Sequence, residues 1–197
     1  LRLKREVSTK FSTALNYSTS RFSLEINPYA NFVNDFKVLI PTTIILSNRG
    51  PFPVWEYRQV NARLIGVDIT ADYDFAKNWN WHSTAAFVYG EDLTTNSALI
   101  DMPPFNFNNT VRFKKANWNN LVVSLKNETV LTQKRYPNND FFVDVLETGE
   151  PVSTLVEISK PPKGYSLLHL NSQMSFDVFE KSKMTIGFTI QNILNTN

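Results

Sequence analysis

The chain has 197 residues and is nearly neutral, with 20 Lys and Arg against 18 Asp and Glu. This balance argues against a nucleic-acid partner, which would need a broad basic surface to neutralise phosphates. Cysteine is absent, which excludes disulfides, thiolate metal sites and a cysteine nucleophile. No apolar run approaches the length of about 20 residues that a membrane-spanning helix needs, so a helical membrane protein is excluded.

Apolar and polar residues alternate with a period of two along much of the chain, and this pattern predicts β-strands. Residues 21–32 show it clearly, because every second position from Phe22 to Phe32 is apolar and the other positions are mostly polar. The pattern predicts eight strands, at residues 7–17, 21–32, 63–75, 79–89, 105–113, 121–131, 168–178 and 184–190. Pro28 lacks an N–H for strand pairing, so we expect a bulge or a missing rung there. Asn109 is an exception, because it is a polar residue at one of the alternate positions of its strand that are otherwise apolar.

The connections between the predicted strands alternate in length. The short ones lie at residues 18–20, 76–78, 114–119 and 179–182, and the long ones at residues 39–54, 90–104 and 135–164. Transmembrane barrels have this asymmetry, with short periplasmic turns and long extracellular loops. Each predicted strand can also cross a bilayer when tilted, which takes about 9 to 11 residues. In the longest loop, residues 141–146 and 152–158 flank a Gly-containing turn, which predicts an ordered hairpin that extends the wall outward.

Aromatic residues gather near both ends of the predicted strands. The group near the short turns comprises Tyr17, Phe22, Tyr73, Phe75, Trp79, Trp81, Phe113, Trp118, Phe176 and Phe179. The group near the long loops comprises Phe32, Trp55, Tyr57, Phe87, Tyr89 and Phe105. Two such belts around an apolar band are typical of outer-membrane barrels. The alternate apolar residues of each strand are therefore expected to face lipid. Glu25 and Asn27, at the polar positions, are expected to face the lumen.

No pattern of residues predicts catalysis, a metal site or a cofactor. His82 and His169 lie far apart and lack the HExxH spacing of a zinc site. The sequence contains no GxSxG, GxGxxG or Walker motif. Asp68, Asp72 and Asp74 share one face of a strand, where a hydrated lumen wall explains them better than a cation site or an acid–base pair.

Three stretches, residues 61–92, 100–113 and 184–197, resemble the C-terminal half of the barrel of TonB-dependent outer-membrane receptors, particularly the type common in Bacteroidetes. The matching elements are Gly66 with Asp68, Tyr89 with Gly90, Pro103 with Pro104, and Asn192 with Asn195 around Ile193 and Leu194. The family usually has Leu-Phe where this chain has Ile-Leu, a conservative difference. The resemblance covers nearly the whole chain, although each motif alone is weakly specific.

The resemblance implies an all-β fold, an antiparallel transmembrane β-barrel segment of about eight strands within a barrel of about 22 strands. Residues 1–197 would form the C-terminal portion of that barrel. The signal peptide, the TonB-contacting segment, the plug domain, the first strands and the final strand would lie outside this sequence. The implied location is the outer membrane of a Gram-negative bacterium. The implied partners are outer-membrane lipid, the rest of the barrel and plug, and the TonB–ExbB–ExbD system acting through the plug.

The function implied by the resemblance is TonB-energised uptake of a bulky solute such as a siderophore, cobalamin, glycan or peptide, without catalysis. Aromatic and charged residues of the long loops are the expected ligand-binding groups: Trp55, Tyr57, Arg58, Asp140 and Phe141. One alternative is a small outer-membrane barrel enzyme whose hydrolysis of lipid or peptide depends on His82 or His169. Another is a soluble β-sandwich for adhesion or assembly, which would be monomeric without detergent.

Overall fold

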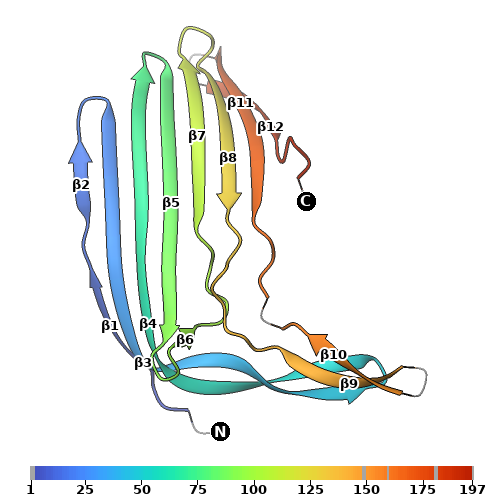
Figure 1. Ribbon diagram of the computed structural model, residues 1–197. Helices are drawn as coiled ribbons and strands as arrows, with labels where there is room; N and C mark the ends of the chain where they lie inside the picture. The colour runs from blue at the N-terminus through green and yellow to red at the C-terminus, as the bar shows by residue number, and fades with distance from the viewer. Residues whose placement is uncertain (1–2, 148–149, 159, 180–181, 197) are drawn as a thin grey trace.

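The computed structural model describes residues 3–147, 150–158, 160–179 and 182–196, which form one antiparallel wall and a separate hairpin (Figure 1). The strands are β1 (Val7–Ser12), β2 (Leu15–Ser18), β3 (Phe22–Ser47), β4 (Gly50–Ala76), β5 (Trp79–Asp92), β6 (Ser97–Ala98), β7 (Asn106–Lys115), β8 (Leu121–Val130), β9 (Phe141–Glu147), β10 (Glu150–Val156), β11 (Tyr165–Phe179) and β12 (Ser182–Ile190). The wall follows chain order, from β1 and β2 through β3, β4, β5, β7, β8 and β11 to β12. The predicted all-β, antiparallel architecture is confirmed.

β1 and β2 together occupy the first strand position of the wall. Both pair with β3 in one register, with Ser12 opposite Tyr29 and Leu15 opposite Ile26. The break between them faces Pro28, which cannot donate a hydrogen bond to the ladder, although its carbonyl accepts one from Thr13 N at 3.2 Å. The expected missing rung is confirmed, and the wall has the eight strand positions that the alternation predicts.

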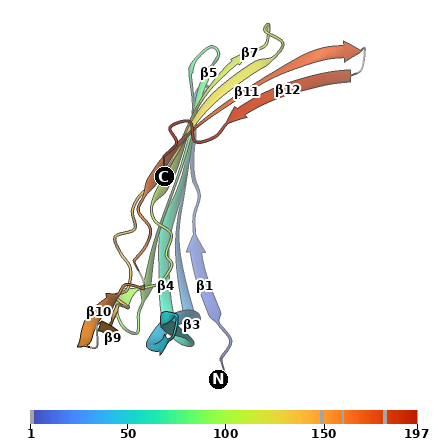
Figure 2. The same cartoon turned by 90° about the vertical axis from the view of Figure 1, so that its right-hand side faces the viewer.

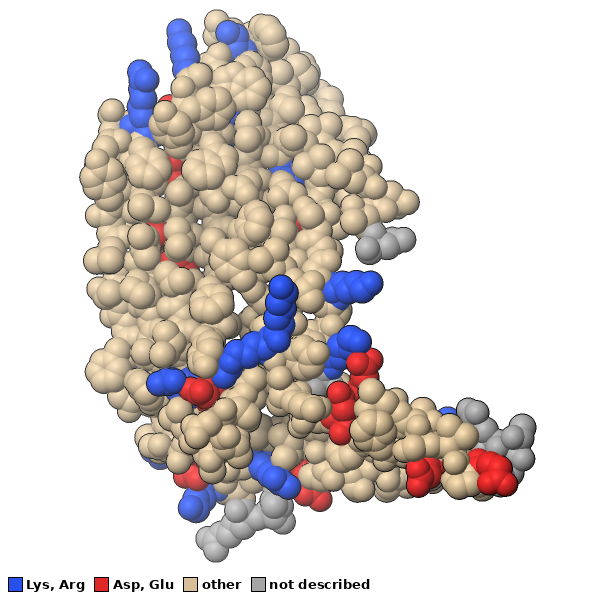
Figure 3. Space-filling view, in the orientation of Figure 1, with Lys and Arg blue, Asp and Glu red and all other residues tan. Residues whose placement is uncertain are grey.

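Strand pairing separates apolar and polar side chains onto two faces of the wall. Ile69 lies opposite Ile26 and Ala85, whereas its neighbour Thr70 lies opposite Glu25 and Thr84. We call these the apolar face and the polar face. The view in Figure 3 shows few charged side chains across the middle of the wall, with basic groups gathered towards its upper and lower ends.

A continuous chain of aromatic rings crosses the apolar face near the short turns. Successive ring centroids lie 4.9 to 6.4 Å apart along Tyr17, Phe22, Tyr73, Phe75, Trp79, Phe113 and Trp118. The first predicted belt is therefore confirmed over these residues. The second group is less continuous: among the described residues at that end, one ring contact joins Phe105 and Phe107, at 5.9 Å.

The short connections share one edge of the wall, at the top of Figure 1, and the long ones share the opposite edge. Residues 19–21, 77–78 and 116–120 form three of the short connections. The fourth joins Phe179 to its partner Ser182, and residues 180–181 lie outside the described part of the chain. The predicted short connections are thus confirmed where they are described. At the opposite edge the connections from β5 to β7 and from β8 to β11 are long as predicted, whereas β3 and β4 are joined by a turn at residues 48–49.

The prediction of a loop at residues 39–54 is wrong, because β3 and β4 remain paired until Ser47 lies opposite Gly50. This end of the pair forms a two-stranded ribbon that turns away from the wall (Figure 1). Its sequence is rich in β-branched residues, which favour extended backbone. Each strand of such a ribbon has a free edge, where Pro41, Pro51 and Pro53 need not donate a ladder hydrogen bond.

The predicted hairpin in the longest loop is confirmed, with Phe141 opposite Val156 and further pairs up to Glu147 opposite Glu150. Its turn at residues 148–149 lies outside the described residues. The expectation that it extends the wall is wrong, because β9 and β10 form a separate sheet against the lower end of the molecule (Figure 2). Pairing of β8 with β11 ends where Val130 meets Tyr165, and the prolines that follow interrupt any continuation.

A small apolar cluster on the polar face anchors the connection between β5 and β7. Its buried members are Val33, Val38, Ala62 and Leu99, and Met102 packs against them. Gly90 permits this approach, because a Cβ at that position would collide with Met102. Gly66 has a similar role nearer the short turns, where the Tyr29 ring lies over it. These glycines belong to two of the motifs noted in the sequence.

Candidate functional site

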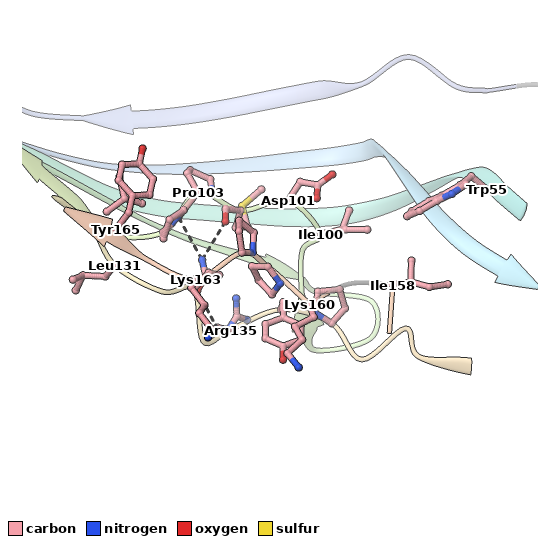
Figure 4. A pocket seen from close by; sticks show the side chains of 18 residues that line it. Trp55, Ile100, Asp101, Pro103, Leu131, Arg135, Ile158, Lys160, Lys163 and Tyr165 are labelled. Carbon is pink, nitrogen blue, oxygen red and sulfur yellow. Dashed lines mark hydrogen bonds between the residues drawn. The ribbon is translucent and has the colours of Figure 1, made fainter. Parts of the chain in front are cut away.

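Three connections and the β3–β4 ribbon enclose a cavity of about 410 Å³ at the long-loop end of the wall. Trp55 comes from β4, and residues 100–104 from the connection between β5 and β7. The end of β8 and the segment after it contribute Val130, Leu131, Gln133 and residues 135–137. The segment before β11 and the first residue of that strand contribute Ile158, residues 160–163 and Tyr165. Figure 4 shows these segments arranged around the hollow.

Side-chain hydrogen bonds to backbone groups hold these irregular segments together. Gln133 Nε2 donates to Met102 O at 3.1 Å and to Pro103 O at 3.4 Å. Thr132 Oγ1 accepts from Gly164 N at 2.8 Å, which joins the segment before β11 to the segment after β8. The cavity walls are therefore linked to one another although they lack regular strand pairing.

Arg135 is the best anchored charged residue of the cavity. Its Nη1 donates to Gly90 O, and its Cζ lies 3.8 Å from the centre of the Tyr89 ring. Its Nη2 lies 3.9 Å from Glu91 Oε1, and Arg63 pairs with the same carboxylate. Stacking on an aromatic ring and pairing with a carboxylate are contacts that suit a planar guanidinium.

The cavity lining combines aromatic rings, prolines and positive charge. It includes Trp55, Tyr136 and Tyr165, and its charged residues are Asp101, Arg135, Lys160 and Lys163. The pKa of Lys160 is raised above its ordinary value by the hydrogen bond to Glu157, 3.0 Å away, and by the charge of that carboxylate. Such a lining can hold a bulky solute by stacking and by attraction to negative groups.

The structure distributes the five predicted ligand-binding residues over several environments. Trp55 lines the main cavity, and Arg58 lines a second cavity of about 400 Å³ that shares Ile100 and Pro137 with it. Tyr57 is exposed opposite Leu39 on the ribbon. The remaining two are Asp140, which accepts a hydrogen bond from Ile158 N at 3.2 Å, and Phe141, paired with Val156. Tyr57, Asp140 and Phe141 line neither of these cavities.

Sequence reasoning missed several cavity residues, namely Arg135, Tyr136, Lys160, Lys163 and Tyr165. All are close in sequence to prolines, in the stretches KRYP (134–137) and KPPKGY (160–165). Cations and tyrosines interspersed with prolines in a long loop are a signal that could have identified them, because prolines keep such segments out of strand pairing and on the surface.

The polar face holds both histidines, on different strands. His82 Nδ1 lies 3.0 Å from Asp72 Oδ1, and His169 Nδ1 accepts from Asn192 N at 3.4 Å. Within the described ranges, no three His, Cys, Asp or Glu side chains are placed to hold a metal ion. The same ranges contain no helix long and apolar enough to span a membrane.

The C-terminal motif forms a turn after β12. Asn192 and Asn195 both have a φ of 49°, the left-handed conformation that Asn tolerates well. The Asn192 side chain donates to Thr196 O and accepts from Thr196 N, both at 3.0 Å. The asparagines therefore shape the chain where it leaves the wall.

A wall with one apolar and one polar face, an aromatic belt and short turns along one edge defines a segment of a transmembrane β-barrel. The family model described as "TonB dependent receptor-like, beta-barrel" matches residues 2–193. The chain belongs to this family. TonB-dependent receptors are outer-membrane proteins of Gram-negative bacteria that act in transport.

Solved structures of the same fold include the copper transporter OprC, with a TM-score of 0.73 and 18% identity. They also include a mutant ferric enterobactin receptor, PfeA, from Pseudomonas aeruginosa, with a TM-score of 0.65 and 14% identity. The FrpB iron transporter from Neisseria meningitidis has a TM-score of 0.59 and 12% identity. Each alignment covers 98% of this chain and 26% of the solved chain, so this chain spans about a quarter of their length. A comparison with curated proteins found no match.

Proposed function

We propose that the chain forms the C-terminal portion of an outer-membrane receptor barrel that takes up a bulky solute by TonB-energised transport. The observation that carries this proposal is the family match over residues 2–193 of a wall with an apolar face. The similar structures named as transporters and receptors agree with it. The aromatic and charged groups of the cavity can contact part of a siderophore, cobalamin, glycan or peptide.

The proposed receptor has partners that act beyond these residues. A plug domain and further strands would complete the barrel, and the TonB–ExbB–ExbD system would act through the plug. Two edges support the completion of the barrel: β1 and β12 each pair on one side only among the described residues. An open sheet edge in lipid leaves backbone groups without hydrogen bonds. The motifs around Gly66, Gly90 and Asn192 support a receptor of the type common in Bacteroidetes.

We propose that Trp55 and Arg58 take part in binding the solute, because each lines a cavity at the long-loop end. Lys163 and Tyr165 join them as cavity residues. Solute binding by Tyr57, Asp140 and Phe141 stays a prediction, which substitution of each residue would test. Their positions on the ribbon and the β9–β10 hairpin allow contact with a solute larger than the cavity.

Uptake by the complete receptor tests the proposal. Cells that depend on it for a labelled solute should lose uptake when either the receptor or TonB is deleted. Trp55→Ala should weaken solute binding about fivefold to thirtyfold, because truncating an aromatic anchor costs about 1 to 2 kcal/mol. Phe52→Ala is the matched control, because Phe52 is an exposed aromatic on the same strand that lines neither cavity. Uptake that persists without TonB would contradict the energised mechanism.

The two alternative functions predict different results. A barrel enzyme would hydrolyse lipid or peptide in a detergent extract, and His82→Ala or His169→Ala would abolish that activity. A soluble β-sandwich would remain monomeric without detergent. Sandwich architecture requires two sheets packed face to face, whereas the described residues form one long wall and a two-stranded hairpin.

A further inference from the structure

An open hollow of about 550 Å³ combines apolar residues with cationic residues at the long-loop end of the wall. Phe87 lies opposite Val67 on the apolar face, and Leu131 N donates to Phe105 O beside it. Phe87 and Leu131 expose 45% and 47% of their surfaces. Lys134 and Arg135 line the same hollow.

The cationic side of the hollow has positive charge that the protein itself leaves uncompensated. Arg63 and Arg135 share the single carboxylate of Glu91. Arg63 Nε is buried and has no hydrogen-bond partner. The Lys134 side chain is exposed, and within the described part of the chain it makes no hydrogen bond or ion pair. Two guanidinium groups therefore share one carboxylate at this end of the wall, and Lys134 adds a further positive charge to the lining of the hollow.

The position of the hollow matches the boundary between hydrocarbon and headgroups. Figure 3 shows basic side chains gathered directly below the part of the wall that has few charges. If the apolar face meets lipid, as the proposed function requires, these cations lie at the level of lipid headgroups. Basic residues at that level attract anionic lipids, and phosphate oxygens accept strong hydrogen bonds from Arg and Lys.

We propose that this hollow binds a phosphorylated anionic membrane lipid. The lipid phosphate contacts Lys134 and Arg135, and an acyl chain lies over Phe87, Phe105 and Leu131. The proposal rests on the membrane placement of the wall in the proposed function, but not on the transported solute. Lys134 lines this hollow and does not line the cavity with Trp55, so the two sites can be tested separately.

Native mass spectrometry of the complete, detergent-purified receptor titrated with phosphatidylglycerol tests the proposal. We expect a bound lipid whose affinity exceeds that of zwitterionic phosphatidylcholine. Lys134→Gln should weaken phosphatidylglycerol binding about fivefold, the equivalent of about 1 kcal/mol per basic residue. Lys134→Gln together with Arg135→Gln should weaken it about thirtyfold by the same relation. Arg135 also holds the loops together, so the double variant can lose binding through misfolding. The single variant Lys134→Gln leaves those loop contacts intact and tests the lipid contact alone.

Lys10→Gln with Arg112→Gln is the matched control, since it removes two positive charges from the polar face. Equal binding by wild type and Lys134→Gln, or equal losses in the test and control variants, would overturn the proposal. Glycerol 3-phosphate offers the headgroup without acyl chains, and binding as tight as that of phosphatidylglycerol would show an anion site instead of a lipid site. Solute uptake by Lys134→Gln should match wild type, so failure of the lipid proposal is distinguishable from failure of the transport function.

Discussion

Adjacent residues of the wall point into opposite environments, and β7 shows this most clearly. Asn108 lies on the polar face, where its Nδ2 donates to Thr84 Oγ1 at 3.4 Å. Asn109 lies on the apolar face, opposite Ser83 and Asn127. Asn127 Nδ2 donates to Ser166 Oγ at 2.8 Å, whereas the Asn109 side chain has no hydrogen bond within the described residues. Alternation predicted both orientations, including Asn109 as an exception.

Replacing Asn109 by Leu should stabilise the complete receptor in a bilayer. A side-chain amide without a hydrogen-bond partner in an apolar environment costs about 1 to 3 kcal/mol, and Leu removes this cost. Asn127→Leu is the control on the opposite residue of β8 and should destabilise the protein by about 0.5 to 1.5 kcal/mol through loss of its hydrogen bonds. Urea titrations of folding into liposomes measure both changes. Destabilisation by Asn109→Leu would show that the amide has a partner in the membrane.

The sequence predicted strands correctly where apolar and polar residues alternate strictly. It failed at residues 39–54, where prolines and β-branched residues are mixed. Residues 63–75 alternate strictly, and β4 places them on two faces as predicted. The ribbon at residues 39–54 was predicted as a loop, although its β-branched residues favour extended backbone. In the structure these residues are paired, and the free edges of the ribbon tolerate its prolines. The cavity could not be predicted, because it depends on how three unpaired segments come together.

The two parities of β4 should differ sharply in their tolerance of charge. Ile69→Lys places a charge on the apolar face at mid-strand and should cost about 2 to 4 kcal/mol in a bilayer. Thr70→Lys should be mild, because the polar face already carries Glu25 opposite Thr70. Folding titrations of the complete receptor into liposomes compare the two variants.

Ile69→Phe distinguishes lipid from a protein core as the surroundings of the apolar face. Lipid adapts to the added volume, whereas a close-packed core resists it by about 1 to 3 kcal/mol. We expect Ile69→Phe to fold with nearly the stability of wild type in the same titrations. Damage as large as that of Ile69→Lys would refute lipid contact at this position.

For the whole molecule, the alternating lengths of the connections predict which ends of the wall lie together. The turn at residues 116–120 and the tip of the β3–β4 ribbon lie at opposite ends (Figure 1). What the sequence did not predict is the shape of the long-loop end. There the β9–β10 hairpin packs beside the wall, because prolines end the β8–β11 ladder before the hairpin begins.

The orientation of the complete receptor in the outer membrane can be tested in living cells. Asn48 is exposed at the tip of the ribbon, and Asn117 is exposed in the turn between β7 and β8. A thiol reagent that cannot cross the outer membrane should label Asn48→Cys in whole cells and leave Asn117→Cys unlabelled, because long loops of such barrels are extracellular and short turns periplasmic. The chain has no cysteine of its own, so residues 1–197 give no background labelling. Permeabilised cells serve as the control, in which both variants should react. Labelling of Asn117→Cys but not Asn48→Cys in intact cells would reverse the orientation and place the cavity with Trp55 on the periplasmic side, where it could not capture an external solute.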